Sequence, residues 1–451
     1  MKKGLNISDK ELLFLSWPIF VELFLRVVIG NINVWMISHY SELAVASVGA
    51  ANQLLNLSVF IYGFITVGSQ IIIAQLIGAK RREEINTVIT TSLYGALFIG
   101  LIVSSIFLLF PGQLLSFMNL DGQLVMIGKS YLRIFGGSLF ISALSSSIIA
   151  VLRSHGFTQP ALLIPLCASI LAVMGNYIAL YGPFGLPHLG VAGLAWSSAI
   201  GNSIGLIIAF SLLNKYLNYS IFNLKFKGIS FSYLKKILAL GLPSSGESLS
   251  YQAAQVVVTM IVASLGSSVL IAKSYVTAIT QFVYLIAAAL SQGNQIMIGR
   301  NVGAKKYEDA YTRGIRTVVI GICCSAIICF FTWLFIHPIM GIFTTNEEVI
   351  NIAYYVLLVD IFLECARAVN MVLVGSLNAS GDVKYPLFCS LLVLWAISLP
   401  FSYTLAVWLK MGLVGVWLAY AIDEILRSLL MLYRWRSGIW KEKSTIHSAE
   451  K

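Results

Sequence analysis

The sequence has little charge for its length. Only 11% of its residues are Asp, Glu, Lys or Arg, and 58% are hydrophobic, with a mean hydropathy of +0.86. Ordinary soluble domains carry about 25% charged residues. A soluble chain of 451 residues cannot solvate so much apolar surface, which excludes soluble enzymes, disordered regulators, coiled coils and disulfide scaffolds. We therefore expect an all-α integral membrane protein, long enough for about a dozen helices of roughly 20 residues.

Sequence motifs for catalysis and for metal binding are missing. There is no HExxH or GxSxG sequence and no GxxxxGK[ST] loop for ATP, and the five histidines are scattered. The six cysteines lie in apolar stretches without the paired spacing of metal ligands, where cysteine acts as a small apolar residue. We expect no catalytic residue, no metal site and no cofactor. Without an ATP site, energy must come from an ion gradient, which favours secondary transport.

Apolar runs predict twelve transmembrane helices in two series of six. The first series is expected near 12–35, 45–76, 88–110, 127–152, 160–182 and 190–214. The second series is expected near 237–263, 268–299, 313–336, 350–376, 385–409 and 412–434. The first run continues through Ile29 without a small-residue cleavage site, so we expect it to stay in the protein as a helix.

Positive charge is concentrated in alternate loops. Basic residues cluster at 80–82 and in the stretch 215–236, whereas the loops around 111–126, 183–189 and 337–348 have neither Lys nor Arg. By the positive-inside rule, both termini are predicted to be cytoplasmic in a multi-pass protein of the cell membrane. We attribute the formal charge of +11 to topology and expect no nucleic-acid partner.

An internal repeat spans the chain. A shift of 225 residues lays VGSQIIIAQLIGAKRRE (67–83) over QGNQIMIGRNVGAKKYE (292–308), with eight identical positions among residues 68–83. The same shift aligns Pro18 with Pro243 and Glu22 with Glu247, so both halves open with P-x-x-x-E. Because both halves have the same loop polarity, the repeat is predicted to be parallel, with its axis along the membrane normal. The expected organisation is an N-terminal lobe (1–214), a cytoplasmic linker (215–236), a C-terminal lobe (237–436) and a cytoplasmic tail (437–451).

Ionisable residues inside the predicted helices are the candidates for ion coupling. Each costs roughly 2.5–3.5 kcal/mol at a helix centre, so it needs partners or a water-filled cavity. Three helices carry such sets: Glu22 with Arg26; Asp360 and Glu364 with Arg367 and Asn370; and Asp423 and Glu424 with Arg427. An ion pair within one helix, which only lowers the cost of insertion, is the structural alternative for each set, and it is strongest for the last set.

Glu247 differs because no basic residue lies one turn away from it in the sequence. Such a carboxyl can exchange a proton or a cation when its surroundings alternate between wet and dry, and Tyr251 could donate a hydrogen bond to it. Lys273 likewise has no acid one turn away, and it could face Glu247 if their helices are adjacent. A hydrogen-bonded carboxyl that only fixes its helix is the structural alternative for Glu247.

The order and spacing of these motifs, together with GSLNASGDVKYP (375–386), resemble the multidrug and toxic compound extrusion (MATE) transporters over about residues 10–436. The resemblance implies two six-helix lobes in a V around a central cavity. It also implies export of amphipathic organic compounds or drugs, driven by inward H⁺ or Na⁺. Gln70 and Gln295 of the repeated motif are then candidate cavity residues. We expect the chain to work as a monomer in the bilayer.

The chain departs from the family pattern at two acidic positions. Many members have an aspartate in the first helix, and the corresponding segment here, NINVWMISHYS, has Asn33 instead. Some members have an aspartate in the C-terminal lobe at about the position of Arg367. Glu247 resembles the family's seventh-helix glutamate, and Asp360 and Glu364 are candidates to replace the missing acid. An arginine that faces the cavity would repel simple organic cations, so an anionic or zwitterionic substrate remains an alternative. A lipid-linked oligosaccharide flippase of the wider superfamily is the alternative function.

Overall fold

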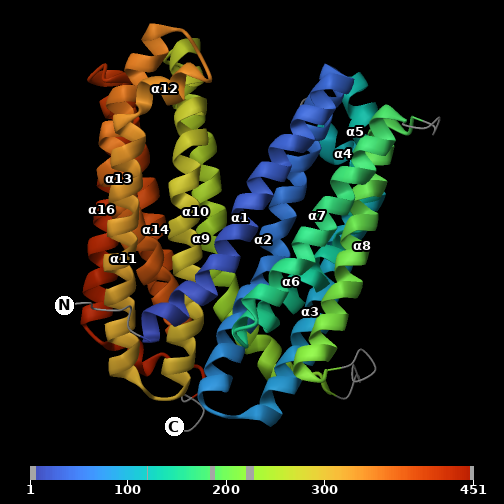
Figure 1. Cartoon of the computed structure of the whole chain (residues 1–451), viewed down its shortest axis with the longest axis vertical. Helices are drawn as coiled ribbons and strands as arrows, with labels where there is room; N and C mark the ends of the chain where they lie inside the picture. Colours follow the sequence, from blue (N-terminus) through green and yellow to red (C-terminus); the bar gives the residue numbers. More distant parts are fainter. Residues whose placement is uncertain (1–6, 119, 183–187, 220–227, 447–451) are drawn as a thin grey trace. The chain divides into compact units, whose positions relative to one another are not determined.

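The structure, a computed structural model, describes residues 7–118, 120–182, 188–219 and 228–446. Within these ranges it is helical and contains no β-strand, so the predicted all-α fold is confirmed (Figure 1). Within each unit the long helices run side by side, as expected for segments that cross a bilayer.

The helices of the first half of the chain are α1 (Ile7–Tyr40), α2 (Glu42–Gly78), α3 (Arg82–Leu109), α4 (Pro111–Ser116), α5 (Gly122–Gly137), α6 (Leu139–Ser154), α7 (Thr158–Tyr181) and α8 (Gly190–Leu217). Those of the second half are α9 (Phe231–Ala263), α10 (Ser267–Gly303), α11 (Tyr307–Leu334), α12 (Ile336–Gly341), α13 (Glu347–Ser380), α14 (Lys384–Val393), α15 (Leu399–Tyr403) and α16 (Gly412–Arg436). Two π-helical turns, Leu394–Ser398 and Thr404–Trp408, join α14 and α15 into one longer span.

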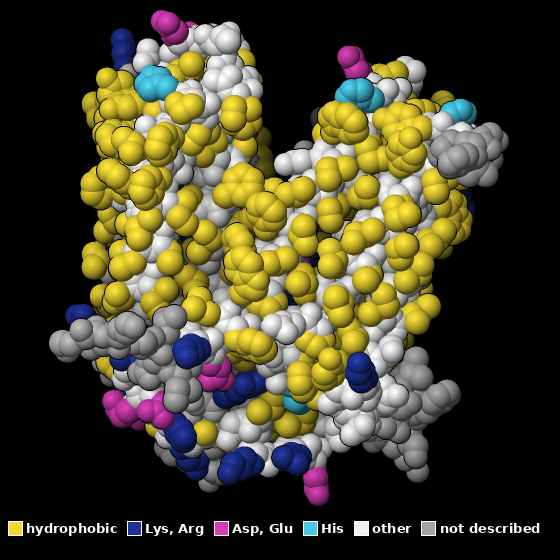
Figure 2. Space-filling view, viewed as in Figure 1, with side chains coloured by type: hydrophobic (Ala, Val, Ile, Leu, Met, Phe, Trp, Pro, Cys, Tyr) yellow, Lys and Arg dark blue, Asp and Glu magenta, His cyan; other side chains and the backbone are white. Residues whose placement is uncertain are grey.

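Twelve segments of the described chain have the length of a membrane crossing. Nine helical spans are long and apolar enough, and α5 and α6 form a tenth span that bends by 44°. The remaining two are α9, with 33 residues, and α16, with 25, which carry more polar and charged side chains. Figure 2 shows hydrophobic side chains along the helices, whereas Lys and Arg gather near the ends that carry the α2–α3 and α10–α11 loops.

The described residues pack into two compact units. Unit 1 takes its residues from Met1–Phe20, Gly78–Lys80 and Gly246–Lys451, and unit 2 takes them from Val21–Ile77 and Arg81–Ser245. The division cuts α1 after Phe20 and α9 after Ser245, two residues after the matched prolines Pro18 and Pro243. The units therefore differ from the expected lobes, because each half's first helix begins in the unit formed mainly by the other half.

Glycines of the repeated motif explain this exchange of helix ends. A Cβ on Gly68 of α2 would collide with the backbone of Ile237 on α9, within unit 2. A Cβ on Gly293 of α10, its counterpart in the repeat, would collide with the Ser16 side chain on α1, within unit 1. Small residues allow such close helix contacts in membranes. In unit 1, Arg313 also binds Asp9 at 2.7 Å.

The predicted tail is folded as far as the structure describes it. Trp440 is fully buried and stacks on Trp435 of α16, with ring centroids 4.1 Å apart. Lys441 binds Glu308 of α11 at 2.7 Å, and Ile446 is buried. The segment from 437 to 446 therefore packs against unit 1; residues 447–451 lie outside the described part.

Candidate functional site

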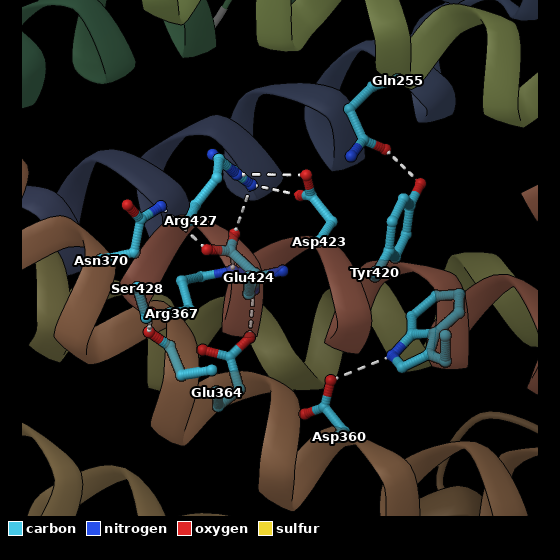
Figure 3. Close-up of polar contacts among 12 residues, drawn as sticks. Gln255, Asp360, Glu364, Arg367, Asn370, Tyr420, Asp423, Glu424, Arg427 and Ser428 are labelled. Atoms are coloured by element: carbon cyan, nitrogen blue, oxygen red, sulfur yellow. Dashed lines mark hydrogen bonds and ion pairs between the residues drawn. The ribbon is translucent and has the colours of Figure 1, made fainter. Parts of the chain in front are cut away.

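A row of polar side chains on α13 lies inside unit 1. Asp360, Glu364 and Asn370 are almost fully buried. Asp360 accepts a hydrogen bond from the indole Nε1 of Trp417 on α16 at 3.0 Å, and Glu364 pairs with Arg367 on its own helix. The helical spacing predicted from the sequence thus places these side chains on one side of α13, where they face α16 (Figure 3).

Glu424 of α16 joins the polar side chains of the two helices. Its Oε1 lies 3.4 Å from Nε of Arg367 and 3.0 Å from Arg427, and its Oε2 accepts a hydrogen bond from Asn370 at 2.9 Å. Arg427 also holds Asp423 through two of its nitrogens, one of them at 3.2 Å. The two sets, for each of which an ion pair within one helix was the structural alternative, therefore form one network between α13 and α16 (Figure 3).

The network contains more carboxyl groups than guanidinium groups. Asp360, Glu364, Asp423 and Glu424 stand against Arg367 and Arg427. With every group ionised, the network has a charge of −2. Within the described chain, Oε2 of Glu364 and Oδ1 of Asn370 are buried and accept no hydrogen bond. Uncompensated negative charge is costly inside a membrane protein.

Glu247 adds a further carboxyl beside this network. It lies on α9, and its Oε1 accepts a hydrogen bond from the hydroxyl of Ser390 on α14 at 2.7 Å. Arg427 and Glu424 both act on it electrostatically. Among the described residues, Asp360 and Glu247 form no ion pair, since their hydrogen-bond partners are neutral.

The structure also shows the surroundings of Lys273 and Tyr251, which the sequence could not establish. Lys273 of α10 donates to the hydroxyl of Thr259 at 2.6 Å. Because Thr259 lies twelve residues beyond Glu247 on α9, about 18 Å along the helix, the idea that Lys273 faces Glu247 is wrong. Tyr251 lies within electrostatic range of Arg367 and Glu424, so it borders the network.

Unit 2 has the opposite balance of charge. Glu22 of α1 is buried and pairs both with Arg26, at 3.2 Å on the same helix, and with Arg153 at the end of α6. One carboxyl group thus stands between two guanidinium groups. Arg153 thus provides a partner for Glu22 that is 131 residues away in the chain.

The remaining predicted residues lie apart from these ion pairs. Asn33, which occupies the place of the family aspartate, accepts a hydrogen bond from Nδ2 of Asn176 on α7 at 3.0 Å. Gln70 and Gln295 are half-buried in α2 and α10. The hydroxyl of Ser154 donates to the backbone carbonyl of Gln70 at 3.2 Å, so this contact does not use the glutamine side chain.

Asp423, Glu424 and Arg427 were one of the three charged sets predicted from sequence, and an ion pair within their own helix was the strongest alternative for them. Their spacing was visible, but nothing in one sequence showed that α16 packs against α13. Ser390 and Trp417 were missed for the same reason, since a serine and a tryptophan in apolar helices give no signal of a carboxylate partner. No group of three or more His, Cys, Asp or Glu side chains is arranged to hold a metal ion in the part of the chain that the structure describes.

The comparisons with known proteins cover nearly the whole chain. A family profile described as MatE matches residues 18–178 and again residues 243–404, in register with the internal repeat. The uncharacterized transporter YisQ of Bacillus subtilis is 36% identical over 438 residues, which cover 97% of this chain and 96% of the relative. A probable multidrug resistance protein NorM of Thermotoga maritima is 24% identical, with 97% and 94% covered.

Solved structures share the fold. The chain matches a MATE transporter in its straight conformation with a TM-score of 0.87 and 20% identity, over 96% of both chains. It matches a MOP superfamily transporter from Pyrococcus furiosus, described as having a binding pocket of reverse polarity, with a TM-score of 0.87 and 21% identity, over 98% of both chains. The twofold profile match and the full-length relatives establish that the chain belongs to the MatE (MATE) family, whose members are multi-pass membrane transporters and not enzymes.

Proposed function

We propose that the chain is an ion-coupled antiporter of the cytoplasmic membrane that exports amphipathic organic compounds by alternating access. The buried network of unit 1, which has more carboxyl groups than guanidinium groups, supports this proposal best. With Glu247 included, five carboxyl groups share two guanidinium groups, so H⁺ or Na⁺ binding relieves an excess of negative charge.

Asp360 and Glu247 are the acids proposed to take up the coupling cation. The other three carboxyl groups of the network already contact Arg367 or Arg427. A bound cation stabilises one conformation of the transporter relative to the other. An ion gradient can drive transport only through this difference in cation affinity between the two conformations. Substrate and ion then move in opposite directions in one cycle.

The proposed substrate class draws on the relatives. Several full-length relatives are named probable multidrug resistance protein, from Thermotoga maritima, Acinetobacter baylyi and Bacillus anthracis among others. We propose the same general activity for this chain, export of drug-like amphipathic molecules. The alternative of a lipid-linked oligosaccharide flippase has no observation in the structure that favours it.

Glu247→Gln and Asp360→Asn test the coupling site. Each variant keeps the shape of the side chain and removes a chargeable group, so we expect the loss of most gradient-driven dye uptake into inverted membrane vesicles, which corresponds to export from the cell. The experiment compares an imposed ΔpH with an imposed ΔNa⁺, and the effective gradient identifies the ion. Glu308→Gln is the matched control, because Glu308 is 82% exposed and outside the network. Normal export by both variants under both gradients would refute the assignment of these two acids.

A further inference from the structure

Arg26 places an exposed positive charge at membrane depth. It is the twentieth of 34 residues of α1, and its side chain is 66% exposed. A guanidinium that faced lipid near the middle of the bilayer would cost roughly 2.5–3.5 kcal/mol on insertion scales. Arg26 therefore faces water within the membrane-spanning part of unit 2.

The charge of Arg26 is not cancelled by its partner. Glu22 forms ion pairs with both Arg26 and Arg153, so one carboxylate is shared by two guanidinium groups. The other acids of unit 2 lie at helix starts or in the loop before α5: Glu42, Glu83, Glu84 and Asp121. The cluster of Glu22, Arg26 and Arg153 therefore has an excess of one positive charge when all three groups are ionised.

The α1 face beyond Arg26 is open and partly polar. Gly30 lies one turn further along α1, and a Cβ built there meets no atom within 4 Å. One turn beyond it, Asn33 is bonded to the buried Asn176, whose Oδ1 has no hydrogen-bond partner among the described residues. Arg26 and Asn33 are about 10 Å apart along the helix. A guanidinium and free space thus follow one another on one face of α1, which continues to the hydrogen bond between Asn33 and Asn176 of α7.

We propose that this face of unit 2, built on Arg26, Gly30 and Asn33, binds the carboxylate of an amphipathic substrate. Arg26 forms a charge-assisted hydrogen bond with the carboxylate, and the apolar body of the substrate lies over Gly30. The carboxylate completes the charge balance that Glu22 leaves open. The site thus selects amphipathic molecules that carry a carboxylate over those that are only cationic. The ligand is a transport substrate by virtue of the export function proposed above.

Equilibrium binding to the purified full-length protein in lipid nanodiscs tests this site without an ion gradient. The probes are a rhodamine with a free benzoate carboxylate and the methyl ester of the same dye, followed by fluorescence anisotropy. We expect the native protein to bind the carboxylate form more tightly. Arg26→Gln is expected to weaken binding of the carboxylate dye about tenfold or more and to leave the ester within about twofold, whereas Arg26→Lys retains most of the preference.

Two further variants locate the site. Gly30→Leu fills the open space without meeting a neighbour and is expected to weaken both dyes. Arg82→Gln removes an equal charge from an exposed position at the start of α3, so it is expected to leave binding of both dyes unchanged. If Arg26→Gln does not fold, Arg26→Lys and Gly30→Leu still decide the question.

Different results would refute the proposed carboxylate site and the proposed export function. Equal weakening of the two dyes by Arg26→Gln, no effect of Arg26→Gln, or full binding by Gly30→Leu would each overturn the proposed site. Selective carboxylate binding without gradient-driven transport of the same dye would instead support the site and overturn the export function. The two proposals therefore fail in different measurements.

Discussion

Arg367 shows how a partner on another helix changes the role of a residue. From sequence it was a candidate for a cavity-facing cation, but its side chain is only 14% exposed and contacts both Glu364 and Glu424. Its charge is therefore committed to the network of unit 1. Arg26 of α1 is 66% exposed instead, and the proposed substrate contact is therefore in unit 2.

Arg367→Gln is expected to destabilise the protein strongly. It leaves Glu364 without a guanidinium and removes one of two from Glu424, and breaking a buried pair in this way typically costs about 3–5 kcal/mol. The double variant Arg367→Gln/Glu364→Gln also removes the carboxyl that loses its partner, while Glu424 keeps Arg427 and Asn370. We therefore expect the double variant to unfold at a higher temperature than Arg367→Gln alone.

Thermal unfolding of the purified variants, followed by size-exclusion chromatography, measures this order. The single variant Glu364→Gln completes the double-mutant cycle. A double variant as unstable as the sum of the two single losses would show that Arg367 and Glu364 act independently, against the network in the structure.

Residue spacing predicted which charged side chains of the network share a helix, but not the contact between the two helices. The positions of Asp360, Glu364 and Arg367 on one helix face follow from the 3.6-residue period, and α13 has that geometry. The contact of this face with Glu424 could not be predicted, because periodicity shows which side chains share a helix but not which helices are neighbours. The partner of Glu22 was missed for the same reason, since Arg153 is 131 residues away.

At the scale of helices, the repeated glycines make a specific prediction about α2. Gly68→Ala would force α2 and α9 apart, because the new methyl group meets the Ile237 backbone, which cannot move aside as a flexible side chain could. We expect a lower unfolding temperature and reduced export. Gly49→Ala on the same helix is the matched control, since its Cβ would meet no atom within 4 Å.

The control variant Gly49→Ala has its own expected effect on the unfolding temperature. Ala is favoured over Gly in a helix by up to about 1 kcal/mol, so Gly49→Ala should leave the unfolding temperature unchanged or raise it slightly. If Gly68→Ala behaves like Gly49→Ala, the close contact between α2 and α9 is not needed for stability.

Helix positions were predictable where apolar residues define them, but helix ends were not. The run near 127–152 was expected as one helix, whereas the structure has α5 and α6 with a bend between Gly137 and Leu139. The helix expected near 12–35 extends from Ile7 to Tyr40, because its polar ends continue beyond the apolar core. The short α4 and α12 follow α3 and α11 at matching places of the two halves, and hydropathy alone gave no sign of them.

At the scale of the whole molecule, the repeat predicted two related halves but not the exchange of their first helices. The profile match starts at residues 18 and 243, which confirms the 225-residue repeat. The residues before each of these prolines pack into the unit formed mainly by the other half. A sequence repeat identifies equivalent segments, but the choice between packing within a half and packing across halves depends on contacts such as that of Gly293 with Ser16.

Orientation in the membrane is a further prediction at this scale. Within unit 2, Arg82 begins α3 and Asp121 follows its far end after α4; within unit 1, Asn346 precedes α13 after the far end of α11. Because the basic loops are predicted to be cytoplasmic, Asp121→Cys and Asn346→Cys should react with an impermeant thiol reagent on intact cells, and Arg82→Cys should react only after permeabilisation. The labelling is measured in a background whose six native cysteines are replaced by alanine. Reaction of Arg82→Cys on intact cells, with protection of the other two, would place the carboxyl-rich network of unit 1 in the opposite orientation and would reverse the direction proposed for transport.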